Sequence, residues 1–128
     1  IALDARVLCA DSTGLRYVVK RGDTYELVKI AIARGESGQV PTGIRLTSDE
    51  VISACFSYDG RVITLVGNSG SIILFDGMTG ELLTKLKSRS DTKKAFLTGN
   101  GQHIIAAGAR PVVWHFLDSR LNYMSQEM

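Results

Sequence analysis

The sequence has few of the residues that bind metals or carry redox chemistry, with only two histidines and two cysteines among 128 residues. His103 and His115 have no cysteine, histidine or carboxylate at a spacing typical of metal ligands. Cys9 and Cys55 lie in predicted strands, which favours buried, reduced thiols over a disulfide. The sequence therefore predicts no metal site.

Motifs that carry common catalytic chemistry are also missing. The chain has no Gly-x-Ser-x-Gly sequence, and neither cysteine has the electropositive surroundings that would activate a thiolate. The glycines of residues 67–70 bracket a hairpin instead of opening a helix, so they do not predict a phosphate site. We therefore predict that the protein is not an enzyme and has no cofactor.

The chain also lacks a strong charge of one sign and a long apolar run. Its net charge of +2 and pI of about 8.7 are too mild to indicate nucleic-acid binding by themselves. No apolar run reaches the roughly 18 residues needed to span a bilayer, and no signal peptide is visible. We expect no membrane span and a location inside the cell, cytoplasmic with the nucleus as an alternative. Because the sequence begins at Ile1 in strand-like residues, we also expect a piece of a longer polypeptide.

Four short apolar segments joined by three turns are present at 51–86. The turns are 58–60, 68–70 and 77–80, and the runs between them are rich in Val, Ile, Leu and Phe. These residues favour a pleated, half-buried surface, whereas the turns contain glycine, asparagine and aspartate. The segment is predicted to form a four-stranded antiparallel meander.

Similar strands are predicted on both sides of this meander. They cover 5–11, 15–20 and 25–33 before it, and 95–97, 104–108 and 112–117 after it. Residues 34–50 are polar and rich in glycine, and we predict a long loop with a short extended piece at 43–46. Residues 118–128 are either one more edge strand or a frayed end.

The strand pattern repeats at a fixed spacing. Phe96 lies 41 residues after Cys55, and Gly101 lies 41 after Gly60. Upstream, residues 7–11 lie 56 residues before 63–67. This spacing exceeds 41 by about 15 residues, which is close to the length of the predicted loop over 34–50. The chain is therefore interpreted as one all-β segment, 1–128, with three units at 1–33, 51–86 and 93–124. The first unit lacks a clear first strand and the third lacks a clear last one.

The middle unit resembles a blade of a WD-repeat β-propeller, a family with a period of ~40–45 residues. Residues 56–60, Phe-Ser-Tyr-Asp-Gly, are similar to its Phe-Ser-Pro-Asp-Gly turn, and residues 74–76, Leu-Phe-Asp, to its closing Leu-Trp-Asp. Trp114 and His115 would be the corresponding pair in the third unit. No Gly-His pair opens any unit, and Ser69 replaces the usual structural aspartate, so the blades would be degenerate.

This resemblance implies a partial propeller, because a ring closes with ~4–8 blades and three blades leave faces and strand edges uncovered. The further blades would then be among the partners of this chain. The structural alternative is a β-sandwich made of meanders.

The family topology would place the loops after each fourth strand beside the second-to-third-strand hairpins. A protein-interaction scaffold inside a larger protein or complex is then the predicted function, with the 34–50 loop and the 87–94 connection as contacts. The alternative is an RNA or phosphate-backbone contact in a ribonucleoprotein assembly. The candidate partner-binding residues are Arg34, Arg45, Lys87, Arg89, Lys93, Lys94 and Arg110.

Overall fold

A computed structural model describes residues 6–32, 39–98, 103–116 and 123–127 of the protein. The described residues form β-strands joined by turns and short connections. In chain order the strands are β1 (Arg6–Ala10), β2 (Arg16–Arg21), β3 (Thr24–Ile32), β4 (Gln39–Thr47), β5 (Val51–Phe56), β6 (Val62–Gly67), β7 (Ser71–Asp76), β8 (Leu82–Lys87), β9 (Lys94–Leu97), β10 (His103–Ala107), β11 (Val112–Phe116) and β12 (Tyr123–Glu127).

The strands form three four-stranded sheets, each of which pairs its strands in chain order. We call them sheet A (β1–β4), sheet B (β5–β8) and sheet C (β9–β12). Every described pairing is antiparallel, so each sheet is a meander. The prediction of repeated all-β meanders is confirmed.

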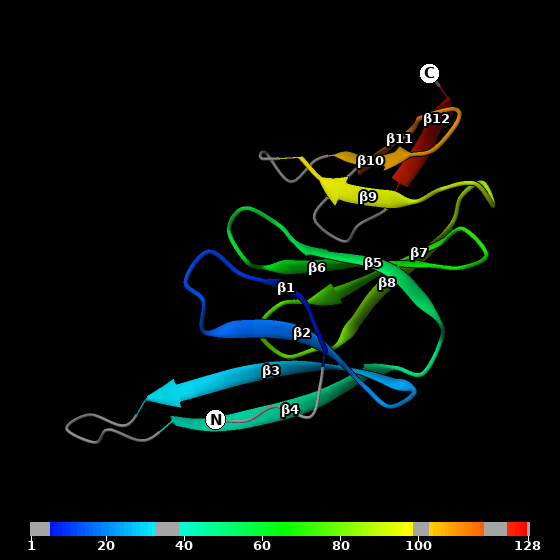
Figure 1. Ribbon diagram of the computed structural model, residues 1–128. Coiled ribbons are helices and arrows are strands. Elements are labelled where there is room, and N and C mark those ends of the chain that lie inside the picture. Colours follow the sequence, from blue (N-terminus) through cyan, green and yellow to red (C-terminus); the bar gives the residue numbers. More distant parts are fainter. Residues whose placement is uncertain (1–5, 33–38, 99–102, 117–122, 128) are drawn as a thin grey trace.

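The three sheets lie one on another in a fan (Figure 1). Their first strands are neighbours, since β5 contacts both β1 and β9. These strands form the inner edge of the fan, and β4, β8 and β12 form its outer edge. Three successive sheets around a common inner edge are the arrangement of propeller blades, whereas a β-sandwich has only two facing sheets.

The predicted long loop over residues 34–50 is wrong for 39–47, which form β4. This strand pairs with β3 and completes sheet A. The sequence around it is polar because β4 is an edge strand, with only one long side next to another strand. The first unit therefore has all four strands, and the expectation that it lacks the first one is wrong.

The equivalence of residues 7–11 with 63–67, 56 residues later, is also wrong, and the turns show the reason. The Asp11 amide donates to the Arg16 carbonyl, just as the Ser57 amide donates to the Val62 carbonyl 46 residues later. Both turns contain a glycine at positive φ, Gly14 at 74° and Gly60 at 75°. The β1–β2 turn thus corresponds to the β5–β6 turn, and β1 is the equivalent of β5 instead of β6.

The two central strands of sheet B, β6 and β7, are buried on both faces, which explains their nearly continuous apolar sequences. Ile63, Leu65 and Phe75 of sheet B pack against sheet A, where they meet Val18 and Leu27. The alternate side chains of the same strands pack against sheet C; these are Val66, Ile72 and Leu74, which meet Ala95, Ile104, Ala106 and Trp114. Two separate apolar layers of the core therefore lie on either side of sheet B.

Candidate interaction rim

Two edges of the fan carry the connections between strands that the structure describes. We call one of them the connection rim; it is formed by residues 22–23, 48–50, 68–70, 88–93 and 108–111. Main-chain hydrogen bonds hold these connections together, from the Asn68 amide to the Glu50 carbonyl (3.1 Å), and from the Ser88 amide to the Gly70 carbonyl (3.0 Å). The connections after β4 and β8 thus lie beside the hairpins, as the sequence predicts.

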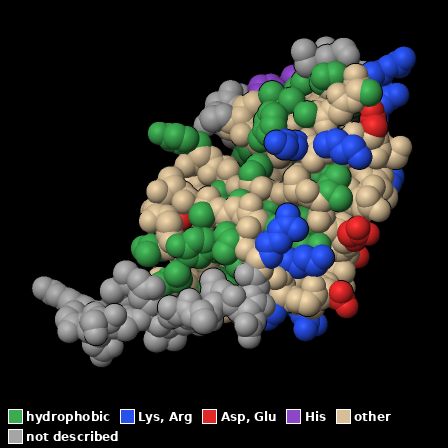
Figure 2. All heavy atoms as spheres, viewed as in Figure 1, with side chains coloured by type: hydrophobic (Ala, Val, Ile, Leu, Met, Phe, Trp, Pro, Cys, Tyr) green, Lys and Arg blue, Asp and Glu red, His purple; other side chains and the backbone are tan. Residues whose placement is uncertain are grey.

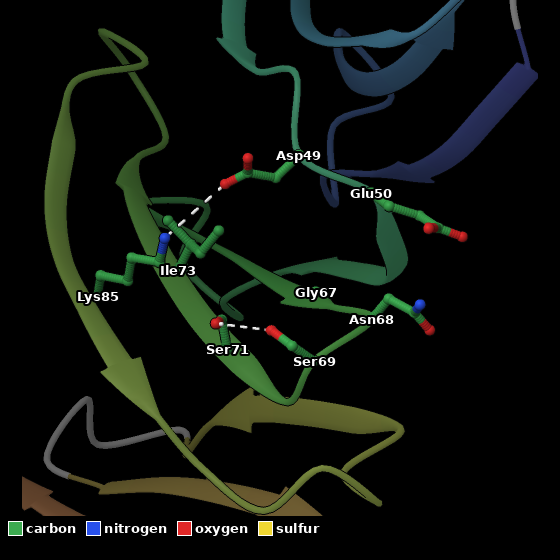
Figure 3. A pocket seen from close by; sticks show the side chains of 8 residues that line it. All are labelled: Asp49, Glu50, Gly67, Asn68, Ser69, Ser71, Ile73 and Lys85. Atoms are coloured by element: carbon green, nitrogen blue, oxygen red, sulfur yellow. Dashed lines mark hydrogen bonds and ion pairs between the residues drawn. The ribbon is translucent and has the colours of Figure 1, made fainter.

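A groove of about 380 Å³ opens on this rim between sheets A and B. It is lined by Asp49 and Glu50 of the β4–β5 connection and by the β6–β7 turn (Figure 3). Asp49 reaches Lys85 across it, with 3.8 Å between carboxylate oxygen and ammonium nitrogen. The Glu50 carboxylate points away from Lys85 toward the outside of the groove. The groove walls therefore carry charges of both signs.

A second groove of about 290 Å³ lies on the other side of Glu50. Lys20, Asp23, Tyr25 and Ser48 complete its lining. The Tyr25 hydroxyl donates to the Val51 carbonyl (3.3 Å) and accepts from the Val51 amide (3.1 Å), which fixes the connection above β3. Because both grooves share Glu50, they form one hollowed stretch of the rim on either side of residues 48–50.

Five of the seven predicted binding residues gather on the part of the connection rim that belongs to sheets B and C. Lys87 is exposed and donates from Nζ to the Ser69 carbonyl at 2.9 Å. Arg89 lies 4.0 Å from Asp91, whose other carboxylate oxygen accepts from the Ala109 amide (2.9 Å). The remaining three, all exposed, are Lys93, Lys94 and Arg110. Figure 2 shows how Lys and Arg side chains alternate with a few acidic ones over this side of the molecule.

The other two predicted residues do not join this group. Arg45 is exposed on β4, the outer strand of sheet A, where it lies opposite Glu26 of β3. Arg34 lies outside the described residues. The sequence placed Arg45 in a loop of the rim. The segment that contains it forms β4 instead, so Arg45 is held in a strand that is paired with β3.

The opposite edge, which we call the Arg16 rim, holds a cluster that the sequence analysis missed. Arg16 Nε lies 2.8 Å from a carboxylate oxygen of Asp11, and the Asp11 side chain is only 1% exposed. Arg16 Nη1 also donates to the main-chain oxygens of Gly60 (3.1 Å) and Gly77 (2.7 Å) in sheet B. One side chain therefore ties the β1–β2 turn to two turns of the next sheet. The 46-residue match between the turns would have drawn attention to Asp11.

The charge state of Asp11 follows from these contacts. Burial alone would raise the pKa of Asp11, but hydrogen bonds from Thr13 and Arg16 and the Arg16 charge outweigh burial and hold that pKa below its usual value. Thr13 donates to both carboxylate oxygens, at 2.8 and 3.0 Å. Asp11 is therefore an ionised structural group with all its partners inside the protein.

The two cysteines of the described part of the chain are partly buried. Burial, together with the nearby Cys55, raises the pKa of the Cys9 thiol to about 12, and burial also raises that of Cys55. Both thiols are thus protonated at neutral pH, and the thiolate is the reactive form. Where the structure describes side chains, it brings together no group of three potential metal ligands. In those same ranges no helix is long and apolar enough to cross a membrane.

No protein-family model and no curated protein sequence matches the chain, but solved structures do. The β-propeller domain of Cps50 (Swd1) from Myceliophteria thermophila matches 97% of this chain and 38% of its own, with 18% identity and a TM-score of 0.70. The C-terminal WD40 domain of Sif2 matches 97% of this chain and 37% of its own, with 16% identity and a TM-score of 0.66. The fold is that of WD40-type propeller blades.

A candidate 6-phosphogluconolactonase from Bacteroides uniformis is similar in the same way, with 12% identity and a TM-score of 0.68 over 94% of this chain and 40% of its own. The chain thus spans about two fifths of each of these three structures. Because WD40 domains and a candidate lactonase both have this fold, the fold alone does not decide the function.

Proposed function

We propose that the protein is a non-catalytic interaction scaffold that binds a protein partner through the connection rim. The observation that carries the proposal is the double groove around residues 48–50 beside the basic connection 88–93. Rigid sheets hold these connections, and variable segments on a rigid scaffold are well suited to recognition. We further propose a location inside the cell, where free thiols such as Cys9 and Cys55 stay reduced.

Charge reversal on the rim tests this proposal. We expect Lys87→Glu combined with Lys93→Glu to remove at least one stoichiometric protein from material that is affinity-purified from the cells of origin. Arg61→Glu is the matched control, because Arg61 is an exposed cation at the Arg16 rim. Identical sets of bound proteins for both variants would contradict the proposal.

An RNA or phosphate-backbone partner is the second candidate, favoured only by the five basic residues of sheets B and C. Asp49, Glu50 and Asp91 lie on the same rim and weaken a purely anionic ligand's binding. The two partners differ in their salt dependence. Phosphate contacts give a steep fall of affinity with salt, whereas an interface with an apolar centre gives a shallow one. Loss of binding after nuclease treatment would favour RNA.

A further inference from the structure

The groove between sheets A and B carries opposite charges that cancel in its middle. Asp49 and Lys85 face each other across it, 3.8 Å apart, and their side chains are 62% and 55% exposed. Glu50 also lines this groove, but its carboxylate points outward, and the remaining lining residues are uncharged (Figure 3). The middle of the groove therefore attracts neither sign of charge.

The end of the rim at sheet A has an excess of negative charge. Asp23 and Glu50 both line the second groove, and both are exposed. No ion pair or hydrogen bond joins either carboxylate to another described residue. The cation of this groove, Lys20, lies over the Tyr25 ring, with Nζ 5.9 Å from the ring centroid. Two carboxylates thus accompany one ammonium group, and this end can accept a further cation.

The end of the rim at sheets B and C has an excess of positive charge. Lys87 begins it, because its Nζ donates to the carbonyl of Ser69, a residue that lines the groove between sheets A and B. In residues 87–94 and 108–111, five cations accompany one carboxylate, that of Asp91. The rim therefore changes from negative to positive between sheet A and sheet C.

The separation of the two charged ends fixes the length of ligand that reaches both. The negative end belongs to sheet A and the 48–50 connection, whereas the positive end begins at Lys87 of sheet B. Packed sheets lie about 10 Å apart, and an extended chain advances about 3.3 Å per residue. An extended peptide that runs across the rim therefore passes from one end to the other in about three residues.

From this charge pattern we infer that the connection rim binds an extended peptide of mixed charge, with a Lys or Arg about three residues from an Asp or Glu. The basic side chain lies beside Asp23 and Glu50, and the acidic one meets Lys87. The inference rests on the proposed function, since it names the class of partner that the same rim takes. A strand of RNA does not fit, because its phosphates would also meet the carboxylates of the negative end.

Selection from a displayed library tests the inference, with the intact protein as target and random peptides of about 12 residues, roughly 40 Å when extended, as probes. We expect the enriched peptides to place a basic residue about two to four positions from an acidic one. Enrichment of purely acidic peptides, or of none, would overturn the inference. The proposed function would survive that result if Lys87→Glu with Lys93→Glu still removed a bound protein, because the partner would then meet the rim in another form.

Charge exchange then places a selected peptide on the rim. Glu50→Lys should weaken its binding about tenfold, and a peptide with Glu in place of its basic residue should recover most of that loss. The thermal midpoint of this variant should stay near that of the wild type, because the Glu50 side chain is exposed. Arg61→Glu, at the Arg16 rim, is the matched control and should leave the affinity unchanged. Equal losses in the two variants, or no recovery with the exchanged peptide, would overturn the inference.

Discussion

Thr64 is a polar side chain inside the apolar layer between sheets B and C. It is 1% exposed, and its hydroxyl has no hydrogen-bond partner among the described residues. A buried hydroxyl without a partner loses its hydration and gains little in return. Valine has nearly the same shape as threonine and no hydroxyl, so threonine is the less favourable residue at this position of the core.

Replacement of that hydroxyl by a methyl group should therefore stabilise the protein. We expect Thr64→Val to raise the free energy of unfolding by about 1 kcal/mol in urea titration. Thr24→Val is the control, because the Thr24 hydroxyl donates to the Arg21 carbonyl at 2.9 Å and its loss should not stabilise. A destabilised Thr64→Val variant would show that the hydroxyl has a partner in solution.

The ion pair of Asp11 and Arg16, in contrast, stabilises the folded protein. Arg16→Ala leaves a carboxylate that is 1% exposed without its cation, and we expect a loss of about 3 kcal/mol in the free energy of unfolding. Arg61→Ala is the control, since the Arg61–Asp59 pair is exposed and 3.9 Å apart. Such exposed pairs contribute about 0–1 kcal/mol. Equal effects of the two substitutions would contradict the role of Arg16 as a tie between sheets.

The same pair makes stability depend on acid. The pKa of Asp11 is lowered in the folded state, so the unfolded chain binds the proton first as the pH falls. The contribution of Asp11 is fully present above about pH 4, the range of an ordinary aspartate, and is lost as the pH falls through the folded value. We expect Asp11→Asn to be less stable than the wild type at about pH 7 and to lose less stability between about pH 5 and about pH 2. Parallel curves of the unfolding midpoint against pH would contradict this assignment.

At the scale of single elements, the β6–β7 turn and the 88–93 connection are fitted to each other. Gly70 has a φ of 89°, and a Cβ at this position would collide with the main chain of Arg89. Gly14 has a φ of 74° but has open space around it. The two glycines therefore separate the cost of backbone conformation from the cost of a collision.

We expect Gly14→Ala to cost about 1 kcal/mol, the penalty of a left-handed alanine. Gly70→Ala should cost more, because the connection must also move. The measurements are urea unfolding of both variants and amide exchange over residues 88–93, which should become faster only in Gly70→Ala. Equal costs with unchanged exchange would mean that the connection is not held by this contact.

The elements also show which features the sequence could predict. The strands of sheet B are rich in apolar residues and are separated by turns that contain glycine, so the pattern of 51–86 located all four of them. β4 has one neighbour in its sheet, and Gln39–Thr47 read as a loop because the segment contains proline, glycine and several polar residues. The basic group on sheets B and C was correctly placed on one rim, since the strand order fixes where the connections lie. The Arg16 contacts could not be foreseen, because they join main-chain oxygens that have no sequence signal.

At the scale of the whole molecule, sheet C is attached mainly through one face of sheet B. Stability in stacked repeats is carried by contacts between neighbours, so the two layers can be weakened separately. We expect Leu74→Ala, in the layer toward sheet C, to cost about 2–5 kcal/mol and to speed amide exchange mainly in sheet C. Leu65→Ala, in the layer toward sheet A, is the mirror control. Uniform acceleration over all three sheets in both variants would indicate a single cooperative unit.

The burial of β6 and β7 on both faces also has an evolutionary consequence. A residue of these two strands has a packed layer on whichever side it points, so few of their positions are free to accept a new polar substitution. The outer strands β4, β8 and β12, in contrast, each have a free edge. A saturation mutagenesis scan should therefore find the lowest tolerance in β6 and β7, with sequence drift concentrated outside these two strands.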